Sequence, residues 1–116
     1  MQLPELVHKQ AVQLVDKYCR ERVPCERYQG LRLGYKLTGN HLTLFEEWQD
    51  PSNEEEWLRA PIARFSFSPE LNQWALFSID HQLRWHIYQI VNPSLNLARL
   101  LKAVDEDPTG IFWGSK

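Results

Sequence analysis

Three side chains that could do chemistry lie close together in the sequence: Arg84, His86 and Tyr88. They are spaced two residues apart, so in an extended strand they project from one face, while Trp85 and Ile87 project from the other. A guanidinium, an imidazole and a phenol in one row could bind an anion such as a phosphate, with His86 as a proton donor. The same spacing also fits a polar strand face that is simply exposed to solvent.

Carboxylates elsewhere in the chain could complete such a site. We expect Glu46 on an apolar strand face, where it needs a cationic partner, a backbone donor or a place at the rim of the sheet. If Glu46 or an acid of segment 105–107 reached the row, a carboxylate–imidazole pair with shifted pKa values would result. The candidate polar cluster comprises Glu46, Arg64, Arg84, His86, Tyr88, Asp105 and Asp107. The alternative is a structural network that holds the C-terminal tail against the sheet.

Metal, cofactor and nucleophilic chemistry have little support in the sequence. Cys19 and Cys25 lie six residues apart, without a Cys-x-x-Cys motif or a neighbouring His, so no closed zinc ligand set exists. We expect two free thiols, with a bridge across a bend at Pro24 as the alternative. No Gly-rich phosphate loop is present. We therefore expect no metal and no cofactor.

The elements that must position these residues follow from periodicity. Apolar residues recur at three- and four-residue steps over 5–22, which predicts an amphipathic helix. Alternation over 31–38 and 41–48, joined by Gly39-Asn40, predicts a β-hairpin. That two-residue turn sets a register in which Leu33 lies opposite Glu46.

Three further strands are predicted at 61–67, 74–79 and 83–91, and an apolar stripe over 97–104 predicts a second helix. Short links favour sequential antiparallel pairing. The predicted fold class is α+β, with an N-terminal helix, a five-stranded antiparallel meander sheet and a C-terminal helix, both helices packing on one sheet face. We expect one compact domain over 1–116, ordered from about 5 to 114.

Acidic residues gather after the predicted hairpin. Residues 46–60 contain six acids and Arg59, and Asp50-Pro51-Ser52-Asn53 favours a loop. We expect an acidic loop over 49–60. Trp57 with Glu54, Glu55 and Glu56 is a candidate interaction surface; alternatively, Trp57 folds back and caps the sheet.

Composition excludes several classes of protein. The chain has 116 residues, a formal net charge of -2 and 14 Trp, Tyr and Phe residues. This charge does not favour nucleic-acid binding. The sequence has no apolar run of the roughly 20 residues that cross a bilayer and no basic-then-apolar leader at its start. We expect no nucleic-acid partner, no membrane association and a cytoplasmic location.

Several sequence words together resemble a known family. They are Gly34-Tyr35 through Gly39, Leu44-Phe45-Glu46 with Trp48, Pro61-Ile62-Ala63-Arg64-Phe65, Trp74-Ala75-Leu76-Phe77, Leu83-Arg84-Trp85-His86-Ile87-Tyr88, and Val104-Asp105-Glu106-Asp107 with Phe112-Trp113-Gly114. In this order and spacing they resemble the bacterial family catalogued as domain of unknown function 3024. The resemblance implies a small cytoplasmic bacterial domain and supplies no catalytic residues.

Two functional hypotheses follow. The first is a non-enzymatic binding module whose partner is another protein or a second copy of the chain, because no catalytic motif accompanies the Trp-rich sheet. The second is a small enzyme or anion-binding domain that uses Arg84, His86 and Tyr88 with an acidic partner.

Overall fold

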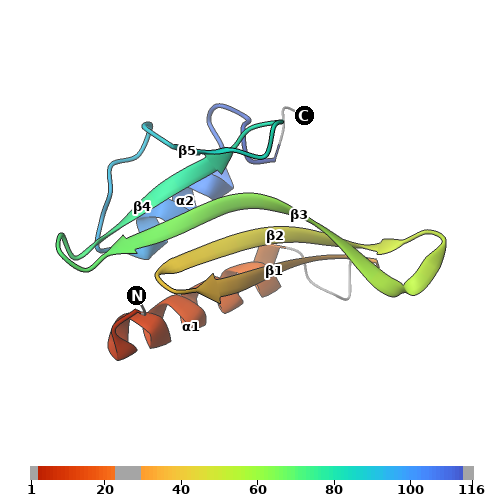
Figure 1. Ribbon diagram of the computed structural model, residues 1–116, viewed down its shortest axis with the longest axis horizontal. Helices are drawn as coiled ribbons and strands as arrows, with labels where there is room; N and C mark the ends of the chain where they lie inside the picture. The colour runs from red at the N-terminus through yellow and green to blue at the C-terminus, as the bar shows by residue number, and fades with distance from the viewer. Residues whose placement is uncertain (1–2, 23–29, 114–116) are drawn as a thin grey trace.

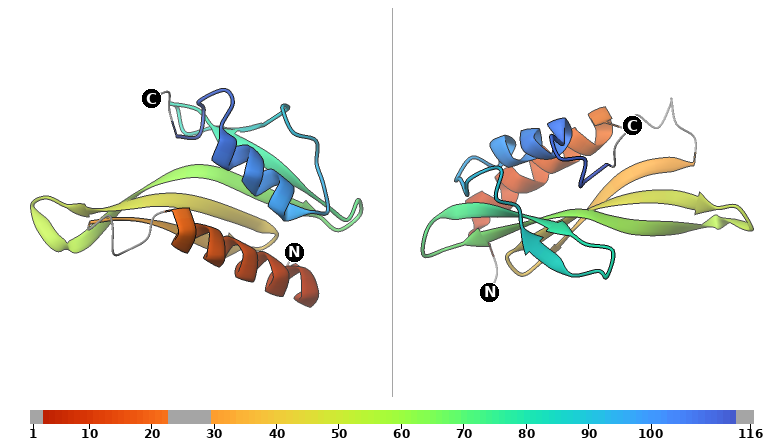
Figure 2. Two further views of the ribbon diagram at one scale, coloured as in Figure 1. Left: turned by 180° about the vertical axis from the view of Figure 1, so that it is seen from behind. Right: turned by 90° about the horizontal axis from the view of Figure 1, so that it is seen from above.

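The structure is a computed structural model that describes residues 3–22 and 30–113. Its elements are α1 (Glu5–Arg22), β1 (Leu31–Thr38), β2 (His41–Asp50), β3 (Asn53–Ser68), β4 (Gln73–Ile79), β5 (Trp85–Ile87) and α2 (Leu97–Glu106). The strands form one antiparallel sheet in the order β1-β2-β3-β4-β5 (Figure 1). Both helices lie on the same face of this sheet (Figure 2). The predicted α+β fold class is therefore confirmed.

The β1–β2 hairpin has the register that its turn predicts. Leu33 pairs with Glu46, and Leu31 pairs with Trp48. Gly39 has φ 61°, the left-handed conformation that a two-residue hairpin turn requires and that glycine adopts without strain. Because side chains alternate along a strand, this register decides which residues of β1 and β2 face the helices.

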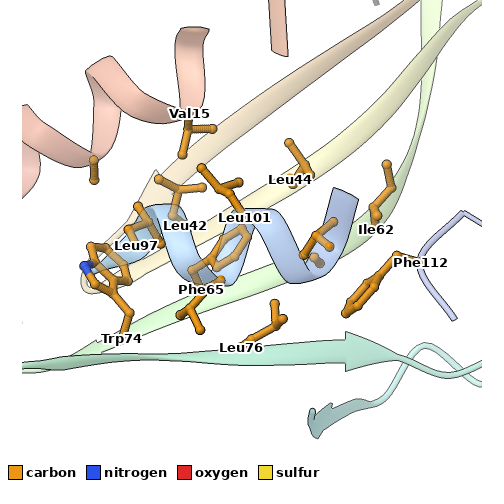
Figure 3. Close-up of a cluster of buried hydrophobic side chains, with 14 of the residues drawn as sticks. Val15, Leu42, Leu44, Ile62, Phe65, Trp74, Leu76, Leu97, Leu101 and Phe112 are labelled. Atoms are coloured by element: carbon orange, nitrogen blue, oxygen red, sulfur yellow. The ribbon is translucent and has the colours of Figure 1, made fainter. Parts of the chain in front are cut away.

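The core lies between the helices and the sheet. α1 contributes its buried stripe of Ala11, Val15 and Cys19, and α2 contributes Leu97, Leu100, Leu101 and Val104. The sheet contributes alternate residues of β2, β3 and β4, among them Leu44, Phe65 and Leu76, which are at most 1% exposed (Figure 3). Burial of this apolar surface is the main stabilising term of the fold.

The acidic loop predicted over 49–60 is wrong, because most of these residues belong to strands. β2 continues to Asp50 and β3 begins at Asn53, so only Pro51 and Ser52 lie between the two strands. The Asp50 carboxylate accepts hydrogen bonds from the backbone N–H and the hydroxyl of Ser52, at 2.9 and 2.7 Å. The loop signal in the sequence is thus a tight turn.

Residues 46–60 of β2 and β3 form a projecting arm. β4 pairs with β3 only from Ala63 to Ser68, so the arm extends beyond the end of β4 (Figure 1). It lies toward one end of the molecule's longest axis, along which the molecule extends 46 Å. Several side chains of the candidate site described below, including Glu47, Trp57 and Arg59, belong to this arm.

Candidate functional site: the uncovered sheet face

The sheet face opposite the helices, called here the uncovered face, carries both cations and aromatic rings. Alternation and the strand pairings place a common set of side chains there: Arg32, Lys36, Phe45, Glu47, Trp57, Arg59, Arg64, Phe77, Trp85 and Ile87. The helix side of the same strands carries the core leucines. The two faces of the sheet therefore differ in chemistry: one is apolar and buried, and the other combines cations with aromatic rings.

Glu47 lies at the centre of the arm's part of this face. Its carboxylate accepts a bond from Nε of Arg32 at 3.1 Å and pairs with Nη2 of Arg59 at 3.2 Å. Although it is charged, Glu47 is only 7% exposed. A carboxylate at this depth is stable when charged donors satisfy it, and here two guanidiniums do so.

The same two guanidiniums cover aromatic rings. Arg32 lies over the Trp57 ring at 3.7 Å from its centroid, and Arg59 lies over Phe45 at 5.0 Å. Trp57, Arg32, Glu47, Arg59 and Phe45 thus form one continuous layer, called here the arginine–aromatic stack. Each planar cation is attracted to the ring face as well as to the carboxylate. The stack holds the arm's side chains in defined positions.

Arg64 is the third guanidinium of the face, and its surroundings differ. It lies over Trp85 at 4.4 Å, and its Nε donates to the Thr43 hydroxyl at 3.2 Å. Within residues 3–22 and 30–113 it has no carboxylate partner. Next to it, Nδ1 of His41 is 2.6 Å from the Ser66 hydroxyl. Burial, and then the charge of Arg64, hold the pKa of His41 below its usual range.

The row of Arg84, His86 and Tyr88 does not form a shared polar surface. β5 spans only Trp85 to Ile87, and Tyr88 lies on the helix side, 6% exposed and packed at 4.9 Å against Phe112. As the spacing predicts, Trp85 and Ile87 project from the opposite side of the strand to His86 and Tyr88. Trp85 and Ile87 are the pair that lies on the uncovered face. The C-terminal tail covers only Tyr88 of the row, while Arg84 and His86 are exposed, so the alternative of a solvent-exposed polar face fits those two residues and not Tyr88.

Asp80 organises His86 and Arg84, a role that the sequence did not assign to it. Its Oδ1 accepts the backbone N–H groups of Gln82 and Arg84 at 2.8 and 2.9 Å, and its Oδ2 lies 2.7 Å from Nε2 of His86. Hydrogen bonds from the Arg84 backbone and the His86 ring are the main causes that lower the pKa of Asp80 to about 2. The signal that could have found it is an Asp at the start of a predicted turn.

Asp105 and Asp107 lie elsewhere and bind different partners. The Asp105 carboxylate accepts from Arg22 at 2.9 Å and from the Tyr18 hydroxyl at 3.1 Å, which links α2 to α1. Burial, followed by the charge of Asp105, raises the pKa of Tyr18. Asp107 accepts the backbone N–H groups of the tail residues Phe112 and Trp113, at 3.2 and 2.9 Å. These acids thus connect the two helices and hold the tail to the end of α2, and neither bonds to the Arg84, His86 and Tyr88 row.

Glu46 and Arg64 are also separated. Glu46 lies on the helix side, opposite Leu33 and Ala60, and is partly exposed. In the part of the chain that the structure describes, it makes no hydrogen bond or ion pair. Arg64 is on the uncovered face. The structure therefore does not bring the predicted polar cluster together.

The predicted interaction surface around Trp57 is only partly as expected. Trp57 is half-buried under Arg32, which supports the capping alternative over a free anchor. Glu55 and Glu56 are exposed on β3. The side chain of Glu54 lies outside those that the structure describes.

The predictions for metal and thiol chemistry can be compared with the structure only for the residues that the structure describes. In that part, no group of three His, Cys, Asp or Glu side chains could hold a metal ion. Cys19 is a buried free thiol in α1, and burial raises its pKa to about 12. Cys25, Pro24 and the predicted ordered end at Gly114 lie outside the described residues.

A hollow lies between the two helices. It has a volume of about 460 Å³, and its walls are mainly apolar, including Val7, Leu14, Trp74 and Leu97. Its lining contains none of the predicted polar residues. No described helix is long and apolar enough to cross a membrane.

Comparison with known proteins places the chain at the level of a family. No curated protein and no solved structure matches it. A family model described as Domain of unknown function (DUF3024) matches residues 3–114, nearly the whole chain. The sheet, the two helices and the tail that covers Tyr88 all lie within this match. The chain therefore belongs to the DUF3024 family.

Proposed function

We propose that this domain is a non-enzymatic protein-interaction module and that the uncovered sheet face is its binding surface. The observation that carries the proposal is the composition of that face: three arginines that each lie over an aromatic ring, two of these rings being tryptophans, next to the partly exposed Phe77 and the 49% exposed Ile87. Trp and Arg are the residues most enriched at the energetic centres of protein interfaces. One broad face of the sheet thus has the chemistry of an interface.

Preorganisation supports the same proposal. The arginine–aromatic stack holds long side chains that otherwise lose rotamer freedom when a partner binds. Glu47 and the rings supply the contacts that hold Arg32 and Arg59. A partner would therefore meet a face whose flexible residues are already ordered.

The alternative, a small enzyme or anion-binding domain built on Arg84, His86 and Tyr88, has weaker support. His86 and Asp80 form a close pair at 2.7 Å, but His86 is exposed and Tyr88 is buried under Phe112. An enzyme of this kind would need His86, as general acid, and the Tyr88 phenol to line the same cavity, and here one is exposed while the other is buried. We also propose a bacterial, cytoplasmic protein, on the basis of the free Cys19 thiol and the resemblance of the sequence.

A photo-crosslinking residue at position 87 tests the binding surface, with the same residue at position 6 as the control. Ile87 is on the uncovered face, and Leu6, 66% exposed, is on α1. We expect a specific protein, or a second copy of the chain, to be trapped from position 87 only. With the purified partner, Ile87→Arg should raise the Kd at least tenfold, about 1.4 kcal/mol, while Leu6→Arg leaves it unchanged. A partner trapped from position 6 alone, or equally from both positions, would contradict the proposal.

A further inference from the structure

The cations of the uncovered face are unequally compensated. Arg32 and Arg59 share the Glu47 carboxylate. Arg64 and Lys36 have no acidic partner within residues 3–22 and 30–113. The uncompensated positive charge of the face therefore lies on Arg64 and Lys36.

Arg64 and Lys36 lie in one cross-strand row. Lys36 pairs with Thr43, and Thr43 pairs with Arg64, so the two cations are two strands apart on the same face. Adjacent strands are spaced by about 4.8 Å, which puts the two backbones roughly 10 Å apart. Phe77 and then Ile87 continue the row beyond Arg64. A cationic segment thus lies beside an apolar one.

Arg64 is held in a geometry suited to a planar anion. Its Nε bonds the Thr43 hydroxyl and its plane lies over Trp85, so its position is fixed from two directions. The terminal Nη groups make no bond within the described residues. A guanidinium fork of this kind binds a carboxylate through two parallel hydrogen bonds.

We propose that Arg64 and Lys36 form a carboxylate-binding subsite, and that the partner of the uncovered face presents an extended acidic segment to it, with apolar side chains that cover Phe77 and Ile87. This inference rests on the proposed function, because it names the chemistry of the partner at that surface. It places an anion site on the face opposite to the one that the Arg84, His86 and Tyr88 spacing suggested.

The same contacts disfavour nucleic acid as the occupant. Single-stranded nucleic acid binds a sheet by stacking bases on open aromatic rings. Here Trp57, Phe45 and Trp85 are already covered by Arg32, Arg59 and Arg64. An isolated carboxylate between apolar residues fits this face better than a chain of phosphates.

The test uses the full chain and an acetylated, amidated decapeptide of alternating Glu and Val residues. The analogue with Gln in place of Glu and a ten-residue oligothymidine are the comparison probes. Binding is followed by ¹⁵N NMR of the arginine Nε–H groups and by fluorescence anisotropy. We expect the Glu peptide to shift the Arg64 signal and to bind more weakly as NaCl is raised from 50 to 500 mM, because salt screens exposed pairs. The Gln peptide should bind at least about tenfold more weakly.

Arg64→Gln should raise the Kd of the Glu peptide about tenfold, and Lys36→Gln should raise it less, because an ammonium does not form the paired bonds of a guanidinium. Arg99→Gln is the matched control, since Arg99 is an exposed arginine on α2. Loss of binding in Arg99→Gln, equal binding of the Gln peptide, tighter binding of oligothymidine or no binding by the wild type would each overturn the inference. If the crosslinked partner is lost in Ile87→Arg but not in Arg64→Gln, the interaction face stands and the carboxylate subsite fails.

Discussion

A Cβ atom at Gly34 would lie 2.7 Å from Oε1 of Glu47, so the absence of a side chain on β1 makes room for the carboxylate of β2. That oxygen is the one that accepts from Arg32. Gly34 has no positive φ; here its role is to allow a close approach. The arginine–aromatic stack therefore depends on a residue that has no polar group of its own.

Gly34→Ala should displace the Glu47 carboxylate from Arg32 and lower the free energy of unfolding by about 1 kcal/mol, as measured by urea denaturation. Lys36→Ala, on the same face of β1 and without a described partner, should change it by less than about 0.5 kcal/mol. If the effect passes through Glu47, Gly34→Ala and Glu47→Ala should be less than additive in the double variant. Full additivity would show that Gly34 acts independently of the carboxylate.

We expect the position of the C-terminal tail, which includes Phe112 and Trp113, to depend on Asp107. It ends α2 with φ 42° and binds the Phe112 and Trp113 amides. Asp107→Ala loses both bonds and places alanine in a left-handed conformation, so we expect a loss of about 1–3 kcal/mol of stability.

Asp107→Asn separates the two causes, because Asn adopts positive φ readily and still offers one acceptor oxygen. It should keep more of the stability than Ala does. Hydrogen exchange of the Phe112 and Trp113 amides measures the effect directly. Unchanged protection of both amides in Asp107→Ala would contradict this account of the tail.

Asp80 gives the β4–β5 turn a defined dependence on pH. Because its pKa is lowered to about 2 in the folded state, it stabilises the fold fully above the unfolded pKa of about 3.9. That contribution is lost as the pH falls through about 2. In Asp80→Asn, the difference from the wild type should therefore be present at pH 6 and shrink between about pH 4 and 2.

The measurement is urea unfolding at a series of pH values, together with a ¹³C NMR titration of the carboxyl groups. Asp50→Asn is the comparison variant, since hydrogen bonds from Ser52 lower the pKa of that carboxyl in the β2–β3 turn. An Asp80 carboxyl that titrates near 4 in the folded protein would contradict the turn geometry.

Cys19 should be unreactive while the domain is folded. Burial, and then the charge of Asp16, raise its pKa to about 12, and the residue is 7% exposed. Only the thiolate reacts, so at pH 8 the modification of native Cys19 by a disulfide reagent should be at least about a hundredfold slower than in urea. A Cys25→Ser variant isolates the Cys19 reaction. Equal rates in the native and the denatured protein would show that α1 does not bury this thiol.

The hairpin and both helices could be predicted because their signals are local. Gly39-Asn40 and the alternation on either side of it set the β1–β2 register, and three- and four-residue apolar spacing indicated α1 and α2. The acidic stretch after Asp50 was misread for a physical reason. Charge and turn residues disfavour burial, but they do not prevent a solvent-exposed strand from pairing with its neighbour.

The candidate site required the tertiary structure. Sequence alternation separated Trp85 and Ile87 from His86 and Tyr88, but alternation alone does not show which side the C-terminal tail will cover. The contacts of Arg64 with Thr43 and Trp85 each join residues 21 positions apart, and no local pattern encodes such a pairing.

By itself, the sequence determined the helices, the order of the strands and the two sides of each strand, since these depend on the spacing of neighbouring residues. Only the tertiary structure decided which sheet face is covered, because that depends on where α1, α2 and the tail pack. It also decided the partner of each charge: Glu47 is shared by two arginines, while Arg64 lies against Trp85 without an acid. Charge compensation depends on distances between strands, which composition does not record.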